Sequence, residues 1–394
     1  MAENVSSFSH KDCNGCGICG DLCPAGAISF IDDELTGFSY PHVDGQKCAA
    51  CGLCVRKCPQ NNPVRRANMF PEAQVLAAWS NDDDIRLLCT SGGIFYELGR
   101  RVIQLGGAVI ACSYTEDFRG AYHRAALTDE ELIPLCGSKY VQSNTTGIYS
   151  KTRELLGKYP LVLFAGCPCQ IAGLYAFLGN DPENLITVDF ICNSINSPKA
   201  QGKYIDCLEE IHGAKCIFSR AKDKRYGWNN FGSSAKFANG REYYASRNED
   251  ARVVGYHSGH LFIRDSCLDC KYKVLPRNAD ITLADFWGIG SDERNPKMEL
   301  GTSAVMMNSQ KGADFMASLG ERVSGYTKTL ADVLRGNGNL LHSVTRSTKS
   351  MEAFRALDSM RFDRVVDRYR TRPSFRNRLI GKIKRIVKRL IGRK

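Results

Sequence analysis

The chain has 394 residues, 43% hydrophobic and 24% charged, with a formal net charge of +11. This is ordinary globular composition, long enough for two or three domains. Residues 361–394 hold 14 Lys/Arg against two Asp, so this segment accounts for +12 and the rest of the chain for −1. A uniformly basic nucleic-acid-binding protein is thereby excluded, and we expect no nucleic-acid partner.

No run of 18 or more apolar residues occurs, and the first 12 residues, MAENVSSFSHKD, are polar. The sequence therefore predicts neither a transmembrane helix nor a secretory signal. We expect a cytoplasmic protein, in which many cysteines are better explained by metal binding than by disulfides.

Residues 1–66 are predicted to form a ferredoxin-like unit that carries two copies of one cysteine spacing. The runs are Cys13, Cys16, Cys19 and Cys23 before Pro24, and Cys48, Cys51, Cys54 and Cys58 before Pro59. Each reads C-x2-C-x2-C-x3-C-P, which binds [4Fe–4S] clusters in two-cluster ferredoxins, where the fourth cysteine of each run ligates the other cluster. We therefore expect one cluster on Cys13, Cys16, Cys19 and Cys58, and another on Cys48, Cys51, Cys54 and Cys23. Zinc and disulfides are the alternatives, but zinc sites usually pair two C-x-x-C units across a longer gap.

Two prolines and Arg65–Arg66 predict a linker, placed at 67–74, before a catalytic domain at 75–345. Strands are expected at Val75–Trp79, Ala108–Tyr114, Leu161–Ala165 and Leu185–Cys192, and helices at Gly92–Leu105, up to Leu178, and from Pro198. This order is typical of βαβ units with parallel strands. Residues 215–265 are expected to be mostly strand. The predicted fold class is α/β, with an α+β N-terminal domain, a parallel βαβ core, an additional β region and a C-terminal basic helix.

Four later cysteines are candidates for a third [4Fe–4S] cluster. Cys169 and Cys192 follow two predicted strands, whose carboxyl ends share one edge of the sheet, and Cys267 and Cys270 form a C-x-x-C pair. Cys167 competes with Cys169 as a ligand. The alternatives are buried core cysteines and a redox or zinc pair, and the spacing alone leaves these open.

Six motifs in order make the chain resemble the beta subunit of coenzyme F-420 hydrogenase/dehydrogenase over about residues 1–310. They are Thr90-Ser-Gly-Gly93, Gly137-Ser-Lys-Tyr-Val141, Gly166-Cys-Pro-Cys-Gln170, Val188-Asp-Phe-Ile-Cys192, Ser266-Cys-Leu-Asp-Cys-Lys271, and Arg277-Asn-Ala-Asp280 with Asp285-Phe-Trp-Gly288. The resemblance implies FAD, iron–sulfur clusters and electron transfer between ferredoxin-type donors and a two-electron acceptor. It also favours the third cluster. Cys167 stands where the family commonly has Thr, and Asn193-Ser194 where it commonly has His-Gly.

With this resemblance, two short segments become candidates for a flavin site. The candidates are Thr90, Ser91, Gly92 and Gly93, which open a predicted helix, and Ser138, Lys139 and Tyr140. Free N–H groups at a helix start hold phosphates or ring oxygens, Lys139 would stabilise negative charge, and Tyr140 would stack. The alternatives are a glycine-rich helix cap and a surface Lys-Tyr. Asp280 and Asp285 are proton donors or loop caps, and we interpret His257 and His260 as structural.

Residues 346–394 are predicted to be a basic tail. Within 377–394, Ile, Leu and Val recur every three or four positions, opposite a face of Lys and Arg. This amphipathic helix is suited to an anionic membrane surface, here the inner face of the membrane. Docking on the protein's own body or on a partner is the alternative.

The sequence thus predicts an FAD- and [4Fe–4S]-dependent oxidoreductase. A ferredoxin or another one-electron donor would supply electrons, and a small-molecule acceptor, a deazaflavin or an organic substrate, would receive them because a flavin converts single electrons into two-electron chemistry. Surface-polysaccharide assembly is a hypothesis that rests on the expected membrane helix. The alternative is a non-catalytic electron-transfer subunit of a larger redox complex.

Overall fold

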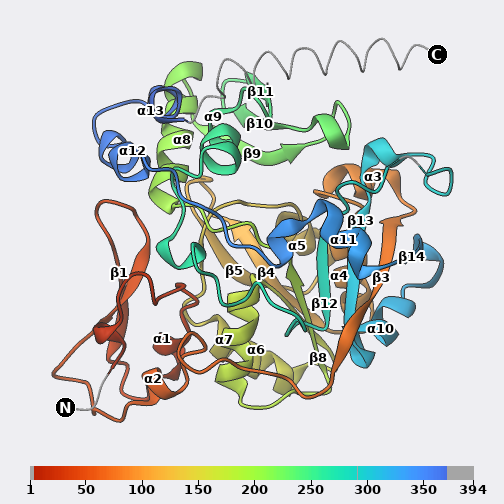
Figure 1. Ribbon diagram of the computed structural model, residues 1–394, viewed down its shortest axis with the longest axis horizontal. Helices are drawn as coiled ribbons and strands as arrows, with labels where there is room; N and C mark the ends of the chain where they lie inside the picture. Colours follow the sequence, from red (N-terminus) through yellow and green to blue (C-terminus); the bar gives the residue numbers. More distant parts are fainter. Residues whose placement is uncertain (1–3, 291, 371–394) are drawn as a thin grey trace.

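The computed structural model describes residues 4–290 and 292–370. The N-terminal unit, drawn in red, lies at one edge of the molecule (Figure 1). A large sheet with helices on both faces occupies the centre, and a smaller sheet with several helices lies at the top of the view (Figure 1).

The N-terminal unit repeats one local structure around its two cysteine runs. It contains α1 (Ile18–Leu22), β1 (Ile28–Asp32), β2 (Ser39–Val43) and α2 (Leu53–Arg56). Gly17 and Gly52, each just before one of the two helices, have φ values of 81° and 67°. Glycine adopts this left-handed conformation without steric cost, so both cysteine loops turn sharply into a short helix.

The central sheet has nine strands within the described residues, in the order β14-β3-β13-β12-β8-β7-β4-β5-β6. They are β3 (Met69–Ser80), β4 (Ala108–Tyr114), β5 (Ala121–Ala126), β6 (Ser143–Asn144), β7 (Val162–Ala165), β8 (Leu185–Phe190), β12 (Ile281–Asp285), β13 (Ser303–Ser309) and β14 (Val323–Lys328). Strands β4, β7, β8 and β12 are parallel, and β3, β5, β13 and β14 extend the sheet through antiparallel pairs. The predicted α/β class with a parallel core is confirmed.

Side chains alternate between the two faces along each strand, so both faces present apolar side chains, and helices cover both. On β7, Val162 and Phe164 pack into one apolar layer and Leu163 into the other. The first layer contains α6 (Ile148–Lys158), α7 (Pro168–Leu178) and α1; the second contains α4 (Ile94–Gln104) and α10 (Gln310–Ala317). None of the described helices is long and apolar enough to cross a bilayer.

Helix α7 has almost no exposed face. Pro168 occupies its first turn, the Cys167 N–H donates to Gln170 Oε1 (2.8 Å), and Gly179, with φ 76°, ends it. Its residues from Cys169 to Phe177 are buried, because the sheet lies on one side and α1 on the other. The start of α7 therefore lies between the sheet and the N-terminal unit.

The smaller sheet and four helices beside it form the third part of the molecule. Its elements are α8 (Pro198–His212), β9 (Cys216–Asp223), β10 (Gly232–Phe237), β11 (Glu242–Ser246), α9 (Ala251–Val253), α12 (Ser350–Ala356) and α13 (Phe362–Tyr369). Outside this part, the other short helices are α3 (Asp83–Leu88), α5 (Asp129–Leu132) and α11 (Leu330–Gly336). Strands therefore occupy 216–246 of the predicted β region, whereas short helical turns follow to 258.

The predicted tail from 346 is wrong for its first part. Phe354 on α12 and Phe362 and Val365 on α13 are buried in one apolar cluster with α8. These two helices join the body because each has an apolar face that α8 covers. The predicted membrane helix at 377–394 lies outside the described residues.

The predicted linker at 67–74 is also wrong. Residues 69–74 belong to β3, where Met69 pairs with Ser309 and Gln74 with Met307. Pro71 is accommodated because it lies near the start of this strand, where a missing N–H is tolerated. The chain thus passes from the N-terminal unit directly into the central sheet.

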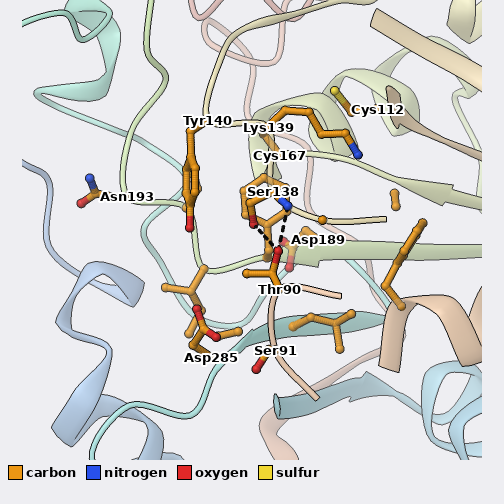
Figure 2. A pocket seen from close by; sticks show the side chains of 18 of the residues that line it. Thr90, Ser91, Cys112, Ser138, Lys139, Tyr140, Cys167, Asp189, Asn193 and Asp285 are labelled. Carbon is orange, nitrogen blue, oxygen red and sulfur yellow. Dashed lines mark hydrogen bonds between the residues drawn. The ribbon is translucent and has the colours of Figure 1, made fainter. Parts of the chain in front are cut away.

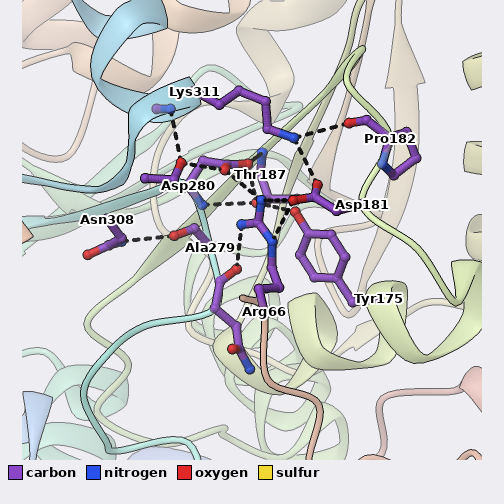
Figure 3. Close-up of polar contacts among 12 residues, drawn as sticks. Arg66, Tyr175, Asp181, Pro182, Thr187, Ala279, Asp280, Asn308 and Lys311 are labelled. Atoms are coloured by element: carbon purple, nitrogen blue, oxygen red, sulfur yellow. Dashed lines mark hydrogen bonds and ion pairs between the residues drawn. The ribbon is translucent and has the colours of Figure 1, made fainter. Parts of the chain in front are cut away.

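Ion pairs of Arg66 hold in place the segment that leads from the N-terminal unit into β3, which we call the crossing segment (Figure 3). Arg66 Nη2 lies 2.9 Å from Asp280 Oδ1 and also pairs with Asp181, which lies 2.8 Å from Lys311 Nζ. Asp280 Oδ2 accepts hydrogen bonds from the Thr187 N–H (2.9 Å) and hydroxyl (2.7 Å). Asp280, considered above as a proton donor or loop cap, is thus a fully buried carboxylate that ties β8, β12 and the crossing segment together.

Replacing Asp280 should destabilise the fold strongly. In Asp280→Ala, Arg66 and Thr187 lose their buried acceptor, and removing one partner of a buried ion pair costs about 3–5 kcal/mol. The matched control is Glu154→Ala, which removes an exposed pair with Lys151 and should cost less than about 1 kcal/mol. Denaturant unfolding of the anaerobic protein measures both, and equal midpoints for the two variants would contradict this assignment.

Candidate functional site

The structure brings four thiols of the N-terminal unit together, and we call Cys13, Cys16, Cys19 and Cys58 the inner thiol group. Burial raises the pKa of the Cys19 thiol, and nearby Cys13 and Cys58 raise it further. Burial likewise raises the pKa of Cys16, which lies near Cys58 and Cys19. Three cysteines of the first run and the last of the second thus lie together, while their ligation of a cluster stays a prediction.

The other four, Cys23, Cys48, Cys51 and Cys54, are the outer thiol group. Cys51 is exposed and the other three are half-buried. Cys54 is near Cys19, and α2, which contains Cys54, contacts α1. The outer thiol group is therefore the part of the cysteine array that solvent and a docking partner reach most easily.

The loop of the inner thiol group is bound to the central domain through its backbone. The Cys16 carbonyl accepts hydrogen bonds from Thr145 Oγ1 (2.7 Å) and the Tyr149 hydroxyl (2.6 Å). A Cβ on Gly15 would lie 2.0 Å from Gln142 Nε2, so a larger residue would have to displace this amide from the loop. The N-terminal unit is therefore packed against the central domain at the loop of the inner thiol group.

A third thiol group comprises Cys169, Cys192, Cys267 and Cys270. All four line a small cavity of about 30 Å³, with Asn14 and Gln60 from the N-terminal unit in its wall. Burial raises the pKa of Cys270 to about 11, and Cys169 and Cys192 raise it as well. The fold therefore gathers these cysteines from the start of α7, the end of β8 and the C-x-x-C loop.

Cys167 lies beside this group without lining its cavity. Nearby Cys169 and Cys192, together with burial, raise the pKa of its thiol, and it lines a larger cavity on the other side. Within residues 4–290 and 292–370, no three His, Cys, Asp or Glu side chains converge on a position for a single metal ion. A tetrahedral zinc site would need sulfurs about 3.8 Å apart, because each Zn–S distance is about 2.3 Å, and the described cysteines form no such site.

The larger cavity, about 420 Å³, lies at the carboxyl ends of β7, β8 and β12 (Figure 2). Its volume is typical of small-molecule sites, as is its place at that edge of the sheet. Six of the seven predicted flavin residues line it, namely Thr90, Ser91, Gly93, Ser138, Lys139 and Tyr140. Two segments that lie far apart in the sequence thus form one wall.

Thr90 and Ser138 join the two segments. The Ser138 N–H donates to Thr90 Oγ1 at 2.8 Å, and the two hydroxyl oxygens are 3.2 Å apart. Ser91 donates instead to the Thr302 carbonyl (2.8 Å). Gly92 does not line the cavity, because a Cβ there would lie 2.5 Å from the Ala78 carbonyl oxygen. Ser91 and Gly92 therefore have contacts that fix the loop itself.

Lys139 and Tyr140 differ in what they offer a ligand. Lys139 Nζ donates to the carbonyls of Leu135 (2.8 Å) and Cys136 (2.9 Å), and burial lowers its pKa. Its ammonium group is thus occupied by backbone oxygens. Tyr140 has a φ of 50°, and its ring lies 4.9 Å from the His257 ring, nearly perpendicular to it. Tyr140 therefore presents an aromatic wall to the cavity.

Three further residues line the cavity: His257, which the sequence interpretation took as structural, Asn337, which it missed, and Asp285, which it left open between proton donor and loop cap. His257 Nε2 has no hydrogen-bond partner among the described residues, and burial lowers the pKa of the ring to about 4, so the ring is neutral. Asn337 follows α11, and its Nδ2 likewise lacks a partner in the part of the chain that the structure describes. Asp285 lines the cavity while it binds Lys222 and the Trp228 Nε1–H, both at 2.7 Å. No local motif marks Asn337, since only the fold places it here.

Two family models match this chain. Residues 12–62 match the 4Fe-4S dicluster domain, and residues 159–333 match the family described as the C terminus of the coenzyme F420 hydrogenase/dehydrogenase beta subunit. With the thiol groups above, these matches define an iron–sulfur electron-transfer protein of an oxidoreductase family. Residues 12–62 are thus similar to a 4Fe–4S dicluster domain, and residues 159–333 to the C-terminal domain of the coenzyme F420 hydrogenase/dehydrogenase beta subunit, as the motifs predicted.

Curated relatives match shorter stretches. The B subunit of the Na(+)-translocating ferredoxin:NAD(+) oxidoreductase complex of Acetobacterium woodii is 36% identical over 95 residues, which are 23% of this chain and 26% of the relative. An uncharacterized ferredoxin of Methanocaldococcus jannaschii is 41% identical over 51 residues, 13% of this chain and 64% of the ferredoxin. The chain thus spans less than two thirds of either relative.

Among solved structures, a chain of the F420-reducing [NiFe] hydrogenase complex from Methanosarcina barkeri is 17% identical, with a TM-score of 0.45. That alignment covers 77% of this chain and 94% of the hydrogenase chain.

The contact at Gly15 gives a test of how the N-terminal unit is attached. Gly15→Ala places a Cβ against Gln142 and Arg264, so we expect a loss of about 1–3 kcal/mol from overpacking beyond the strain of its positive φ. Gly26→Ala is the matched control, since its φ is 58° and nothing lies within 4 Å of the added Cβ. Thermal unfolding and hydrogen exchange over residues 12–62 measure the difference, and identical behaviour of the two variants would rule out this attachment.

Proposed function

We propose that this protein is an iron–sulfur flavoprotein oxidoreductase. Electrons would enter at the outer thiol group from a ferredoxin or another one-electron donor. They would pass through the inner and third thiol groups to FAD in the large cavity and then to a two-electron acceptor, a deazaflavin or an organic substrate. Surface-polysaccharide metabolism remains a hypothesis for that substrate.

The observation that carries this proposal is a shared wall. Cys192 and the residues Asn193 to Ile195 border both the small cavity of the third thiol group and the large cavity. On the other side, Cys169 lies near Cys16 of the inner thiol group, and Tyr272 lies near both groups. The three thiol groups and the large cavity thus form a continuous row, which supports stepwise electron transfer.

The residues of the large cavity fit a flavin. Helix α4 starts there after Gly93, so its first N–H groups and its dipole suit a phosphate or ring oxygen. Three cavity-lining side chains carry buried nitrogens without partners among the described residues, His123 Nδ1, His257 Nε2 and Asn337 Nδ2. A bound flavin would supply the conversion between one-electron and two-electron transfer. Thr90 and Ser138 would hold it, and Tyr140 would shield it from water.

The third cluster is assigned to Cys169, Cys192, Cys267 and Cys270 in this proposal. Cys169 is preferred to Cys167 because only Cys169 lines the small cavity. Cys167 borders the large cavity instead, at the N-terminus of α7.

Metal and flavin contents of the anaerobically purified protein test this function. We expect about 12 iron per chain, from three [4Fe–4S] clusters, and bound FAD. Cys267→Ala should lower iron to about 8 and slow the reduction of FAD by a reduced ferredoxin. The matched control is Cys207→Ala, also a buried cysteine but one in the apolar core around α8.

Two results would contradict the proposal. Clusters without bound flavin would make the chain a non-catalytic electron-transfer subunit. Full iron content in Cys267→Ala would refute the assignment of the third cluster.

We also propose that residues 377–394 attach the protein to anionic membrane surfaces, on the strength of their basic amphipathic pattern. Deleting 373–394 should abolish co-sedimentation with vesicles that contain anionic lipid at low salt, whereas neutral vesicles should bind neither form. Unchanged binding of the deletion variant to anionic vesicles would refute this role.

A further inference from the structure

A buried arginine contacts a sulfur of the inner thiol group. Arg264 is 0% exposed, and its N–H donates to the Ile195 carbonyl (3.0 Å), which anchors it in the central domain. Its side chain reaches the first cysteine loop, where Nε donates to the Cys13 carbonyl (2.9 Å) and Nη2 lies 3.6 Å from Cys13 Sγ. A guanidinium thus hydrogen-bonds both the backbone and the thiol of Cys13.

The rest of the guanidinium is also held firmly. Nη1 donates to Gln142 Oε1 (2.7 Å) and Nη2 to the Ser39 carbonyl (3.1 Å). The Tyr40 ring centroid lies 4.3 Å from Cζ, and that of Phe38 lies 5.2 Å away. Contacts from both the N-terminal unit and the central domain therefore fix its position relative to Cys13.

This buried cation has no carboxylate partner in the described part of the chain. The adjacent Asp265 pairs with Arg346, and none of the ion pairs between described residues includes Arg264. Burying an uncompensated charge is expensive, so an anion is expected beside it. The neighbouring group able to supply that anion is the thiolate of Cys13 with the cluster it would ligate, whose thiolates and sulfides outweigh the charge of its irons.

We propose that Arg264 is the counter-ion of the cluster held by the inner thiol group and raises its reduction potential. Reduction adds one negative charge to the cluster, and a nearby cation stabilises the reduced form more than the oxidised form. Hydrogen bonds to ligand sulfurs and local charge are established determinants of cluster potentials. The inference rests on the assignment of Cys13 as a ligand made above.

This role depends on the docking of the N-terminal unit. Arg264 and Gln142 belong to the central domain, whereas Cys13, Ser39 and Tyr40 belong to the N-terminal unit. The inner cluster would therefore acquire its raised potential only when the two parts are packed together, and it would then accept electrons from the outer cluster more readily.

Potentiometric titration of the whole, anaerobically purified protein, followed by the EPR signals of the reduced clusters, tests the proposal. In Arg264→Gln one cluster should become harder to reduce. We expect its reduced-to-oxidised ratio at a fixed potential to fall about tenfold, which is 59 mV for a one-electron couple. Arg264→Lys, which retains the charge, should stay within about twofold of the wild-type ratio.

Gln142→Glu provides a second variant in case Arg264→Gln loses its cluster. It places a carboxylate against Nη1 with nearly the same shape, and it should shift the same cluster in the same direction. Arg252→Gln is the matched control, because this buried arginine lies over Tyr204 and bonds Ser219 and Arg220 instead. Its cluster potentials should equal those of the wild type.

Unchanged potentials in both Arg264→Gln and Gln142→Glu would overturn the proposal. A tenfold shift in Arg264→Lys would also overturn it, because the charge would then not be the cause. Absence of flavin or of the third cluster would contradict the proposed function but would leave this measurement on the dicluster unit intact.

Discussion

The burial of α7 between the central sheet and the N-terminal unit is the constraint on which the arrangement of thiols depends. The helix is apolar on nearly every side, so it must be covered twice, by β-strands on one face and by α1 on the other. That double covering brings the loop of Cys16 next to the N-terminus of α7, where Cys169 begins the third thiol group. Covering an apolar helix and placing two thiol groups side by side are thus consequences of the same packing.

Polar groups make this packing specific. The carbonyl of Cys16 accepts two hydrogen bonds from the central domain, and Arg264 reaches Cys13 from the same side. Arg66 and Asp280 fix the point at which the chain enters the sheet. Because buried polar groups are costly without partners, a shifted position of the N-terminal unit would leave several of them unsatisfied.

Much of the fold could be predicted where the pattern was local. Strand β4 has the predicted bounds, and α7 and α8 begin at prolines that the sequence shows, because alternation and capping act within a few residues. The predictions failed where packing overrode composition. Residues 69–74 became a strand by pairing with β13, and α12 and α13 joined the body because α8 offered an apolar partner. Neither partner can be recognised from the segment itself.

The sequence by itself determined the chemistry that the protein can hold, since the spacing of each cysteine run and the order of six motifs are local properties. Its motifs also singled out Thr90 and Ser138, whose loops line the large cavity. Only the tertiary structure decided which thiols meet, that Cys192 borders two cavities, and that Arg264 lies against Cys13. These are contacts between residues far apart in the chain, and they form because distant apolar surfaces must be buried together.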